Sequence, residues 1–441
     1  MFCYSSIGSG GVSYSRPPRW QPGLRRRIGG CDRVASGARM PWGLAIALVA
    51  TLALGACSKS SGGHGSATDT TSTYHADDHP PADNSQPVVN LTWDTGAVKI
   101  SDNVYFAEYP RVHRLGGDTL LLTYHCGPST NTWGNVALRQ STDGGQTWSP
   151  AVLVEPATIP GYYGFSDPDI LVMQNGWLMM AFVGRGNPDD NTHDNVQIAL
   201  SKDRGQTWGT PQIIVSGRSW EPGMVQLPNG TIDVFYSSEA AWWPSANPQQ
   251  EILMVSSADN GATWTTTPKH VSYAAGDRDG MPVPVLLQNG KGIAFAIESV
   301  NNSQSPWIQW SSVDANFNYE TYGTIDNGRR WLATQQPIWG GAPYLIQLPT
   351  GETLLSVQDA GGRSIGSDWH KNTMLVLAGN TIAQNFSQVT QPWPNLPTDE
   401  GAYYNSLYLS NDTTLVALTT RNFPDGHSEI WWKRGTLKRG Q

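Results

Sequence analysis

A short motif, S-x-D-x-G-x-x-W, occurs three times in this chain and restricts its fold more than any other feature. The copies are Ser141–Trp148, Ser201–Trp208 and Ser257–Trp264, and a degenerate fourth copy spans Ser312–Tyr319. Successive copies start 60, 56 and 55 residues apart, which is typical of an array of supersecondary units. In such a turn the Asp accepts backbone hydrogen bonds, the Gly allows a positive φ, and the Trp fills the gap between neighbouring sheets. The motif is therefore predicted to be structural and indicates a β-propeller.

A second repeat predicts the number of blades. Six apolar residues are each followed by a tight-turn sequence and another apolar segment, and Asn-Gly or a related pair in that position is a strong hairpin signal. Spaced by 54 to 61 residues, these apolar landmarks are Leu115, Met173, Leu227, Leu287, Leu348 and Leu409. Helical periodicity is nearly absent, whereas Trp, Tyr, Gly and Pro are abundant. The chain is therefore predicted to be all-β, with six four-stranded blades forming a β-propeller.

The first 57 residues are predicted to lie outside this fold. Arg25-Arg26-Arg27 and Arg39 precede an apolar segment, 42–54, which ends in Leu54-Gly-Ala-Cys57. A basic region, a short apolar segment and small residues before a Cys resemble a bacterial lipoprotein signal peptide with its lipobox. The apolar segment is too short for a transmembrane helix. We therefore expect an exported protein held in the bacterial cell envelope by a lipid on Cys57, which would be its only contact with a membrane.

Composition divides the rest of the chain into two parts. Residues 58–87 are rich in Ser, Gly, Thr, Asp, His and Pro and are predicted to be a disordered linker, and the propeller is assigned to residues 88–441. The leader has seven Arg and one Asp, so removing its net charge of +6 from the −8 of the whole chain leaves about −14. This charge disfavours nucleic acid as a partner. With Cys57 lipidated, Cys126 has no cysteine to pair with. No metal or cofactor is expected, and the protein is expected to be a monomer.

Polar side chains are predicted to gather on one rim of the propeller. A hairpin joins each inner strand to the second strand, so the start of the first and the end of the second lie on the same rim. Proline stands five positions before the landmark in five blades, and Tyr404 takes that place in the sixth. Near these positions are Tyr109, His125, Glu239, Met281 and Arg421. The residues predicted to bind substrate there are Arg111, Asp167, Asp169, Arg278, Tyr344, Gln358, Tyr403, Tyr404 and Asn405.

Two glutamates of this rim are predicted to be catalytic. Glu221 lies between Trp220 and Pro222 at a strand start. Glu298 ends the apolar segment 293–297, where an acid is costly unless it is paired or used. Glycoside hydrolysis needs one carboxyl group with a raised pKa as the acid and a second group that stays ionised. Adjacent blades can supply such a pair across the channel.

Several segments resemble the retaining exo-arabinanases of glycoside hydrolase family 93, which are sialidase-like propellers, and the repeated turn is similar to the Asp box of the sialidase superfamily. The segments are Tyr109–Val112, Trp220–Pro222, Gly280–Val283 with Glu298, and Ala342–Tyr344 with Leu354–Gln358. The resemblance covers essentially the whole globular part. It implies a sialidase-like fold and exo-acting hydrolysis of arabinan or a related oligo- or polysaccharide. It also implies that Glu221 and Glu298 are catalytic, with Glu221 as the nucleophile and Glu298 as the acid/base.

Two alternatives stay open. Sialidases hold a substrate carboxylate with three arginines and use a Tyr–Glu nucleophile with an Asp acid/base. Arg111, Asp167 and the segment Ala402–Leu407 are similar to parts of that pattern. However, no Arg-Ile-Pro occurs at 109–111, and Arg278 and Arg421 are only candidates for the other arginines. The second alternative is a non-catalytic glycan-binding propeller, because inactive proteins with Asp boxes exist.

Overall fold

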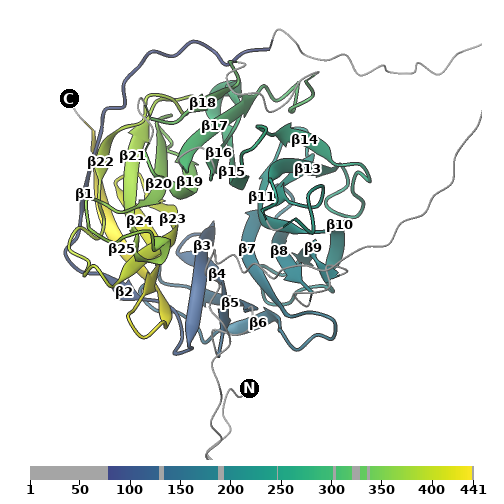
Figure 1. Cartoon of the computed structure of the whole chain (residues 1–441), viewed down its shortest axis with the longest axis horizontal. Helices are drawn as coiled ribbons and strands as arrows, with labels where there is room; N and C mark the ends of the chain where they lie inside the picture. The colour runs from purple at the N-terminus through teal and green to yellow at the C-terminus, as the bar shows by residue number, and fades with distance from the viewer. Residues whose placement is uncertain are drawn as a thin grey trace, which may run out of the picture. The chain divides into compact units, whose positions relative to one another are not determined.

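Six antiparallel sheets surround a central axis (Figure 1), so the predicted all-β, six-bladed propeller is confirmed. The computed structural model describes residues 78–128, 134–186, 193–245, 247–300, 304–319, 328–334 and 338–439. The predicted signal peptide, Cys57 and the linker up to residue 77 lie outside these residues. Within them, no helix is long and apolar enough to cross a membrane.

Each blade has four main strands, and the innermost strands lie nearest the axis in Figure 1. From the innermost strand outward, blade 1 contains β3 (Phe106–Gly116), β4 (Thr119–Gly127), β5 (Asn135–Ser141) and β6 (Val152–Glu155), and blade 2 contains β7 (Gly164–Val172), β8 (Leu178–Arg185), β9 (Asn195–Ser201) and β10 (Gln212–Ser216). Blade 3 contains β11 (Ser219–Gln226), β12 (Ile232–Ser238), β13 (Glu251–Ser257) and β14 (Lys269–Ser272), and blade 4 contains β15 (Asp279–Leu287), β16 (Gly292–Ser299), β17 (Ser305–Ser311) and β18 (Arg330–Leu332). Blade 5 contains β19 (Gly341–Gln347), β20 (Thr353–Asp359), β21 (Thr373–Gly379) and β22 (Ser387–Thr390), and blade 6 contains β23 (Gly401–Asn411), β24 (Thr414–Asn422), β25 (Ser428–Arg439) and β1 (Val89–Trp93), with β2 (Val98–Lys99) also paired to β25. The only helices in the described ranges are two 3₁₀ turns, η2 (Gln288–Gly290) and η3 (Trp369–Lys371).

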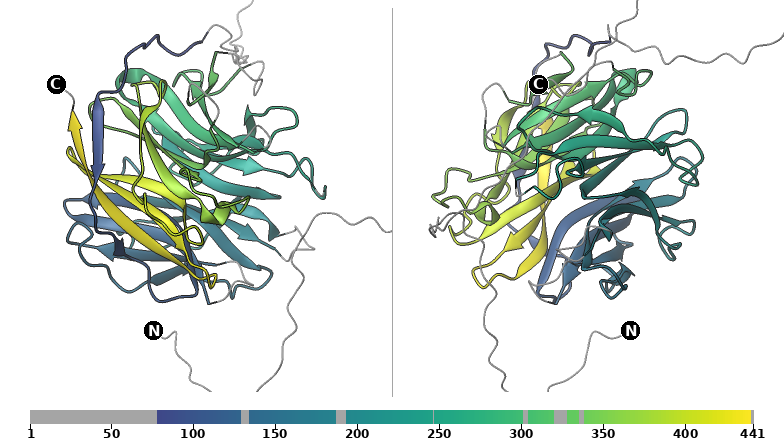
Figure 2. Two further views of the ribbon diagram at one scale, coloured as in Figure 1. Left: turned by 60° about the vertical axis from the view of Figure 1, so that its left-hand side comes forward. Right: turned by 45° about the vertical axis from the view of Figure 1, so that its right-hand side comes forward.

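The ring is closed by the two ends of the described chain. The N-terminal strand β1 pairs antiparallel with the C-terminal strand β25, from Val89 opposite Arg439 to Trp93 opposite Gly435. Figure 2 shows these two strands side by side at the edge of the propeller. Because β1 is the outermost strand of blade 6, the first and last segments of the propeller belong to one sheet.

Residues 78–87, which the sequence analysis placed in a disordered linker, contact the propeller. The Asp78 carboxylate accepts hydrogen bonds from the backbone N–H of Ser312 (3.2 Å) and the hydroxyl of Tyr319 (3.0 Å). Asp83 accepts a hydrogen bond from Thr381, and its backbone carbonyl accepts one from Asn380 (2.7 Å). These ten residues therefore form a strap across blades 4 and 5 that leads into β1. The composition of this segment did not predict the strap, because it gives no sign that Asp78 and Asp83 form hydrogen bonds with the propeller.

The hydrophobic core consists of six clusters, one between each pair of neighbouring blades. For example, Met179 and Ile198 of blade 2 pack against Ile232 and Val234 of blade 3. Trp148, Trp208 and Trp264 of the repeated motif pack against three of these clusters, so the prediction that they fill gaps between sheets is confirmed. This arrangement buries both faces of every sheet and fixes the blades around the axis.

The repeated turns have the predicted hydrogen bonds and lie at the ends of third strands, on the same rim as the hairpins. In the second copy the Ser201 hydroxyl accepts the N–H of Gly205 (2.8 Å), and the Asp203 carboxylate accepts the N–H of Thr207 (2.9 Å). The degenerate fourth copy is shifted by one residue from its predicted position. Its serine is Ser311, which ends β17 and accepts the N–H of Phe317 (2.8 Å).

Candidate active site

The same backbone irregularity occurs near the start of all six inner strands. A register shift interrupts the pairing of each inner strand with the second strand, and one residue at each shift has a positive φ. These residues are Tyr109 (61°), Asp167 (54°), Glu221 (47°), Met281 (57°), Ala342 (45°) and Tyr404 (49°). A left-handed conformation costs a residue with a side chain on the order of 1–2 kcal/mol. Six such bulges at equivalent positions therefore indicate a functional constraint, because backbone strain is concentrated at functional sites.

The bulges bring these six side chains toward the axis. Tyr109, Met281 and Ala342 form one small apolar cluster, against which Tyr404 packs. The acids Asp167 and Glu221 line a cavity together with Tyr404. A proline follows the bulge residue in five blades. In the sixth blade Asn405 occupies the position of that proline, whereas the sequence predicts Tyr404, one residue earlier. The register of β23 explains this difference, because the position equivalent to the other landmarks is Ser410, a polar residue.

The cavity has a volume of about 340 Å³ and opens on the rim opposite the hairpins. It is built from the starts of inner strands, the ends of second strands and adjoining loops. Its lining consists of Phe106, Glu108, His125, Gly134, Tyr163, Ser166, Asp167, Trp220, Glu221, Tyr404 and Gly426. The predicted convergence of polar groups on this rim is therefore present for Asp167, Glu221 and Tyr404. Aromatic walls and a few polar groups are typical of a small-molecule site.

Glu221 is held by blades 3 and 4. Its Oε2 accepts hydrogen bonds from the Ser237 hydroxyl (2.9 Å) and from the backbone N–H of Met281 (3.2 Å). Burial raises the pKa of Glu221 to about 8, and the negative charges of Asp167 and Glu298 act in the same direction. A carboxyl group with this pKa is protonated at neutral pH and can serve as a general acid.

Glu298 lies at the end of β16, in the neighbouring blade. Its Oε2 accepts a hydrogen bond from the backbone N–H of Ala342 at 2.7 Å. Burial raises its pKa, but the Ala342 N–H, a hydrogen bond from Gln304 and the positive charge of Arg278 oppose that shift. Both glutamates flank Gly280: a Cβ atom there would lie 3.6 Å from Glu298 Cγ and 3.7 Å from Glu221 Oε2. The predicted pair therefore meets across two adjacent blades.

Sequence reasoning missed Glu108, which contacts three polar side chains beside this pair. Glu108 accepts hydrogen bonds from the hydroxyls of Tyr403 (2.9 Å) and Ser428 (2.9 Å). His125 Nε2 lies 3.6 Å from Glu108, and its Nδ1 accepts the backbone N–H of Asp167 (3.3 Å). Burial acts to raise the pKa of Glu108, but these neighbours together hold that pKa below its ordinary value. Glu108 directly precedes Tyr109, the bulge residue of blade 1, so its position in the repeat could have indicated that it lies near the site.

Five predicted substrate-binding residues lie outside the cavity. Arg111 is only 2% exposed and donates to the backbone carbonyls of Pro110 (2.9 Å) and Asn405 (3.4 Å). Asp169, paired with His113 at 2.8 Å, and Tyr344 line a different cavity toward the hairpin rim. Asn405 is buried. Arg278 forms an ion pair with Glu239 at 2.5 Å. Each bulge changes which way the following residues point, so residues beyond it turn away from the candidate site.

Two further predicted residues support the cavity from behind. Tyr403 is buried, and its hydroxyl donates to Glu108. Gln358 is also buried, and its Oε1 accepts the backbone N–H of Tyr404 at 3.1 Å, which fixes the bulge of blade 6. Among the residues that the structure describes, no three His, Cys, Asp or Glu side chains are grouped to hold a metal ion.

The six blades and the repeated turns define a sialidase-like β-propeller. Residues 176–343 match the family model of the BNR repeat-like domain, and no curated protein matches the sequence. The chain is similar to a protein of unknown function from Dyadobacter fermentans, with 18% identity and a TM-score of 0.62, over 80% of this chain and 100% of that one.

Two enzymes with this fold are also similar to the chain. One is an α-L-arabinofuranosidase of Fusarium graminearum, a member of glycoside hydrolase family 93, with 17% identity and a TM-score of 0.53, over 78% of this chain and 97% of that one. The other is a Hadza microbial sialidase, with 14% identity and a TM-score of 0.56, over 75% of this chain and 66% of that one. The likeness is one of fold, and this fold is shared by glycoside hydrolases that act on different sugars.

Proposed function

We propose that this protein is an exo-acting, retaining glycoside hydrolase that cleaves arabinan-type or related oligo- and polysaccharides. One observation carries the proposal: two partly buried carboxyl groups, Glu221 and Glu298, flank Gly280 at the propeller axis, and the pKa of one is raised to about 8. The strained bulge that places Glu221 supports it, as does the cavity beside that residue. The arabinan preference rests on the motif resemblance and on the similarity to the Fusarium enzyme.

The proposed mechanism uses the two carboxyl groups in different protonation states. Protonated Glu221 donates its proton to the glycosidic oxygen while the Glu298 carboxylate attacks the anomeric carbon, which forms a glycosyl-enzyme and releases the leaving group. Glu221, now ionised, then takes a proton from water, and that water displaces Glu298. This order reverses the one implied by the sequence resemblance. Burial raises the pKa of both groups, but neighbouring negative charges raise that of Glu221 further, to about 8, whereas the positive charge of Arg278 opposes the shift at Glu298.

The charges around the cavity favour a neutral sugar over an anionic one. None of the described residues that line the cavity is an arginine. Arg185 and Arg218 lie 3.5 Å from the Asp194 carboxylate, and Arg218 and Arg278 both contact Glu239. A substrate carboxylate would therefore compete with two internal ones and face the acids of the cavity.

The test is hydrolysis of 4-nitrophenyl α-L-arabinofuranoside, linear arabinan, xylan and sialyl-lactose by the purified protein. We expect activity on an arabinofuranosyl substrate, and a loss of about 10²- to 10⁴-fold in kcat for Glu221→Gln. Azide should restore turnover to Glu298→Ala by occupying the place of the lost carboxylate. Rescue of Glu221→Ala instead would restore the original order of roles. Activity on sialyl-lactose alone would favour a sialidase, and inactivity on every glycan would favour a binding protein.

A further inference from the structure

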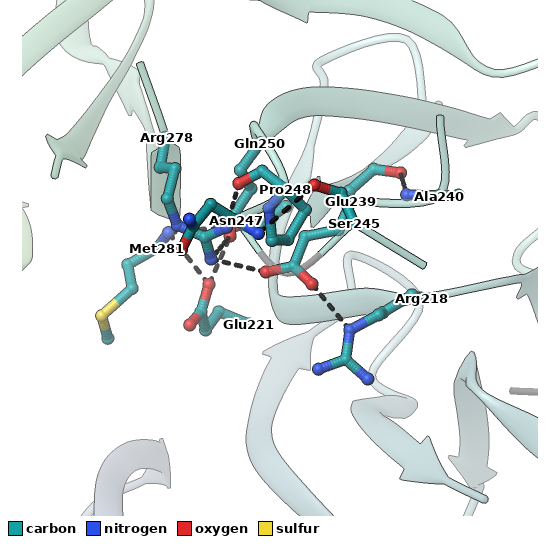
Figure 3. Close-up of polar contacts among 12 residues, drawn as sticks. Arg218, Glu221, Glu239, Ala240, Ser245, Asn247, Pro248, Gln250, Arg278 and Met281 are labelled. Carbon is teal, nitrogen blue, oxygen red and sulfur yellow. Dashed lines mark hydrogen bonds and ion pairs between the residues drawn. The ribbon is translucent and has the colours of Figure 1, made fainter. Parts of the chain in front are cut away.

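A chain of polar and charged side chains runs from the end of β12 toward the candidate catalytic residue Glu221 (Figure 3). Glu239, which directly follows β12, is 2% exposed. Its carboxylate accepts hydrogen bonds from Arg218 Nε (2.7 Å) and Arg278 Nη2 (2.5 Å). Two arginines on one buried carboxylate hold all three side chains in fixed positions, because charge-assisted bonds of this kind are strong when solvent is excluded.

Arg278 in turn orients the side-chain amide of Gln250. Its Nη2 donates to Gln250 Oε1 at 2.8 Å, and its Nη1 donates to the carbonyl of Pro248 at 2.5 Å. A guanidinium has only donors, so the amide must present its oxygen to Arg278 and its NH₂ group elsewhere. The ion pair with Glu239 thereby determines which end of the Gln250 amide faces the site.

The NH₂ group of Gln250 faces the gap between the candidate catalytic residues. Its Nε2 lies 2.7 Å from the point where a Cβ atom of residue 280 would stand, and Glu298 Cγ and Glu221 Oε2 lie 3.6 and 3.7 Å from that same point. Only glycine at position 280 leaves this space to the amide. None of the described residues accepts a hydrogen bond from Nε2, although Gln250 is only 6% exposed. Nε2 is not among the fully buried side-chain atoms that lack a partner, so this donor is available to a group placed between Glu221 and Glu298.

We propose that Gln250 is a substrate-binding residue whose NH₂ group donates a hydrogen bond to a hydroxyl of the sugar unit held between Glu221 and Glu298. Arg278 and Glu239 are positioning residues for this donor. The inference rests on the proposed glycosidase function and adds to it a specificity determinant. An amide suits this place because it donates without a charge, whereas a lysine or arginine would lower the pKa of the acid beside it.

The test is a comparison of Gln250→Ala with the wild-type protein on 4-nitrophenyl α-L-arabinofuranoside and on its monodeoxy analogues. We expect kcat/KM of the variant to fall by about 10- to 100-fold on the parent substrate, the range for one hydrogen bond to a substrate hydroxyl. On the analogue that lacks the partner hydroxyl, the two proteins should have equal kcat/KM. The matched control is Gln249→Ala, whose side chain bonds to Tyr273 (2.9 Å) and Gly276 (2.8 Å) instead and should leave kcat/KM unchanged.

The positioning roles are tested by Glu239→Gln, which should give the same pattern across the analogues and add little to Gln250→Ala in the double variant. If Glu239→Gln does not fold, Gly280→Ala provides the same test, because its methyl group would displace the Gln250 amide. A wild-type kcat/KM for Gln250→Ala, or an equal loss on every analogue, would overturn the role of Gln250 and leave the proposed function intact. Wild-type protein that hydrolyses no glycoside would overturn both.

Discussion

At the scale of single residues, the six bulges show how one backbone position is used for different purposes. The left-handed residue is an acid in blades 2 and 3, whereas tyrosine, methionine or alanine in the other four blades pack together. The strain is therefore repeated around the ring, but only two copies bring a carboxyl group to the axis. Glu221 combines this position with burial and with the negative charge of Asp167, which is why its pKa is raised.

The pKa of Glu221 predicts the pH dependence of activity. If Glu221 is the acid, it must be protonated, so kcat/KM should fall as the pH rises through about 8. Asp167→Asn removes a negative charge that helps to raise this pKa, so the basic limb of the profile should move to lower pH. The measurement is kcat/KM against pH for the wild-type and variant proteins. An unchanged basic limb in Asp167→Asn would contradict this account of Glu221.

A second prediction concerns Asn405, which occupies the place of the five prolines. The residue is buried, and within the described ranges neither polar atom of its side-chain amide has a hydrogen-bond partner. Asn405→Pro removes these unpaired groups and restricts the unfolded chain, while the backbone carbonyl that accepts from Arg111 is kept. We expect a gain of about 1 kcal/mol in the free energy of unfolding, measured by urea denaturation. A less stable variant would show that the backbone of blade 6 differs from the other blades here.

At the scale of elements, the repeated turns and hairpins were predictable because their signals are local. A turn of eight residues contains its own donors, acceptors and glycine, so its sequence specifies its structure. The bulges are different, because each depends on pairing with a second strand. Side chains beyond a bulge point away from the candidate site, so the prediction that Asp169 and Tyr344 line it was wrong. Gln250 could not be predicted from local sequence, because its connection to the site depends on its hydrogen bond with Arg278. Glu221 and Glu298 were found because an acid beside apolar residues is unusual at any position.

The repeated turns are predicted to contribute to stability and not to catalysis. Hydrogen bonds from the Thr207 hydroxyl and backbone N–H lower the pKa of Asp203 to about 2, and a hydrogen bond from Ser201 has a smaller effect in the same direction. Asp143 and Asp259 accept equivalent hydrogen bonds in their own turns. Their pKa in the folded state is below that in the unfolded state. Their contribution is therefore present above about pH 4 and is lost as the pH falls toward 2.

Asp203→Ala should accordingly unfold at a lower temperature at pH 7, and its difference from the wild-type protein should shrink in acid. Turnover per folded molecule should stay near the wild-type value, because the turn lies on the rim opposite the cavity. Thermal melts followed by circular dichroism and active-site titration measure the two effects separately. A folded Asp203→Ala protein whose turnover has dropped by orders of magnitude would refute the structural role.

At the scale of the whole molecule, we propose that the predicted lipobox anchors the protein in the cell envelope through a lipid on Cys57. Wild-type protein expressed in a bacterium should take up labelled palmitate and sediment with membranes, and Cys57→Ala should do neither. Cys126→Ala is the matched control, because Cys126 is a buried cysteine of blade 1 that should carry no lipid. Absence of label in the wild-type protein would refute the signal-peptide prediction.

The pairing of β1 with β25 also sets the order in which the molecule can be completed. The strap and β1 are among the first described segments to leave the ribosome, yet the partner of Val89 is Arg439, close to the end of the chain. Until blade 6 has been made, β1 has no sheet to join and the blade ring stays open. A chain interrupted anywhere before β25 therefore leaves β1 without its partner strand, with its backbone N–H and C=O groups unpaired. Ring closure therefore has to wait for β25, so the blade whose outermost strand comes first along the described chain is the last to be completed.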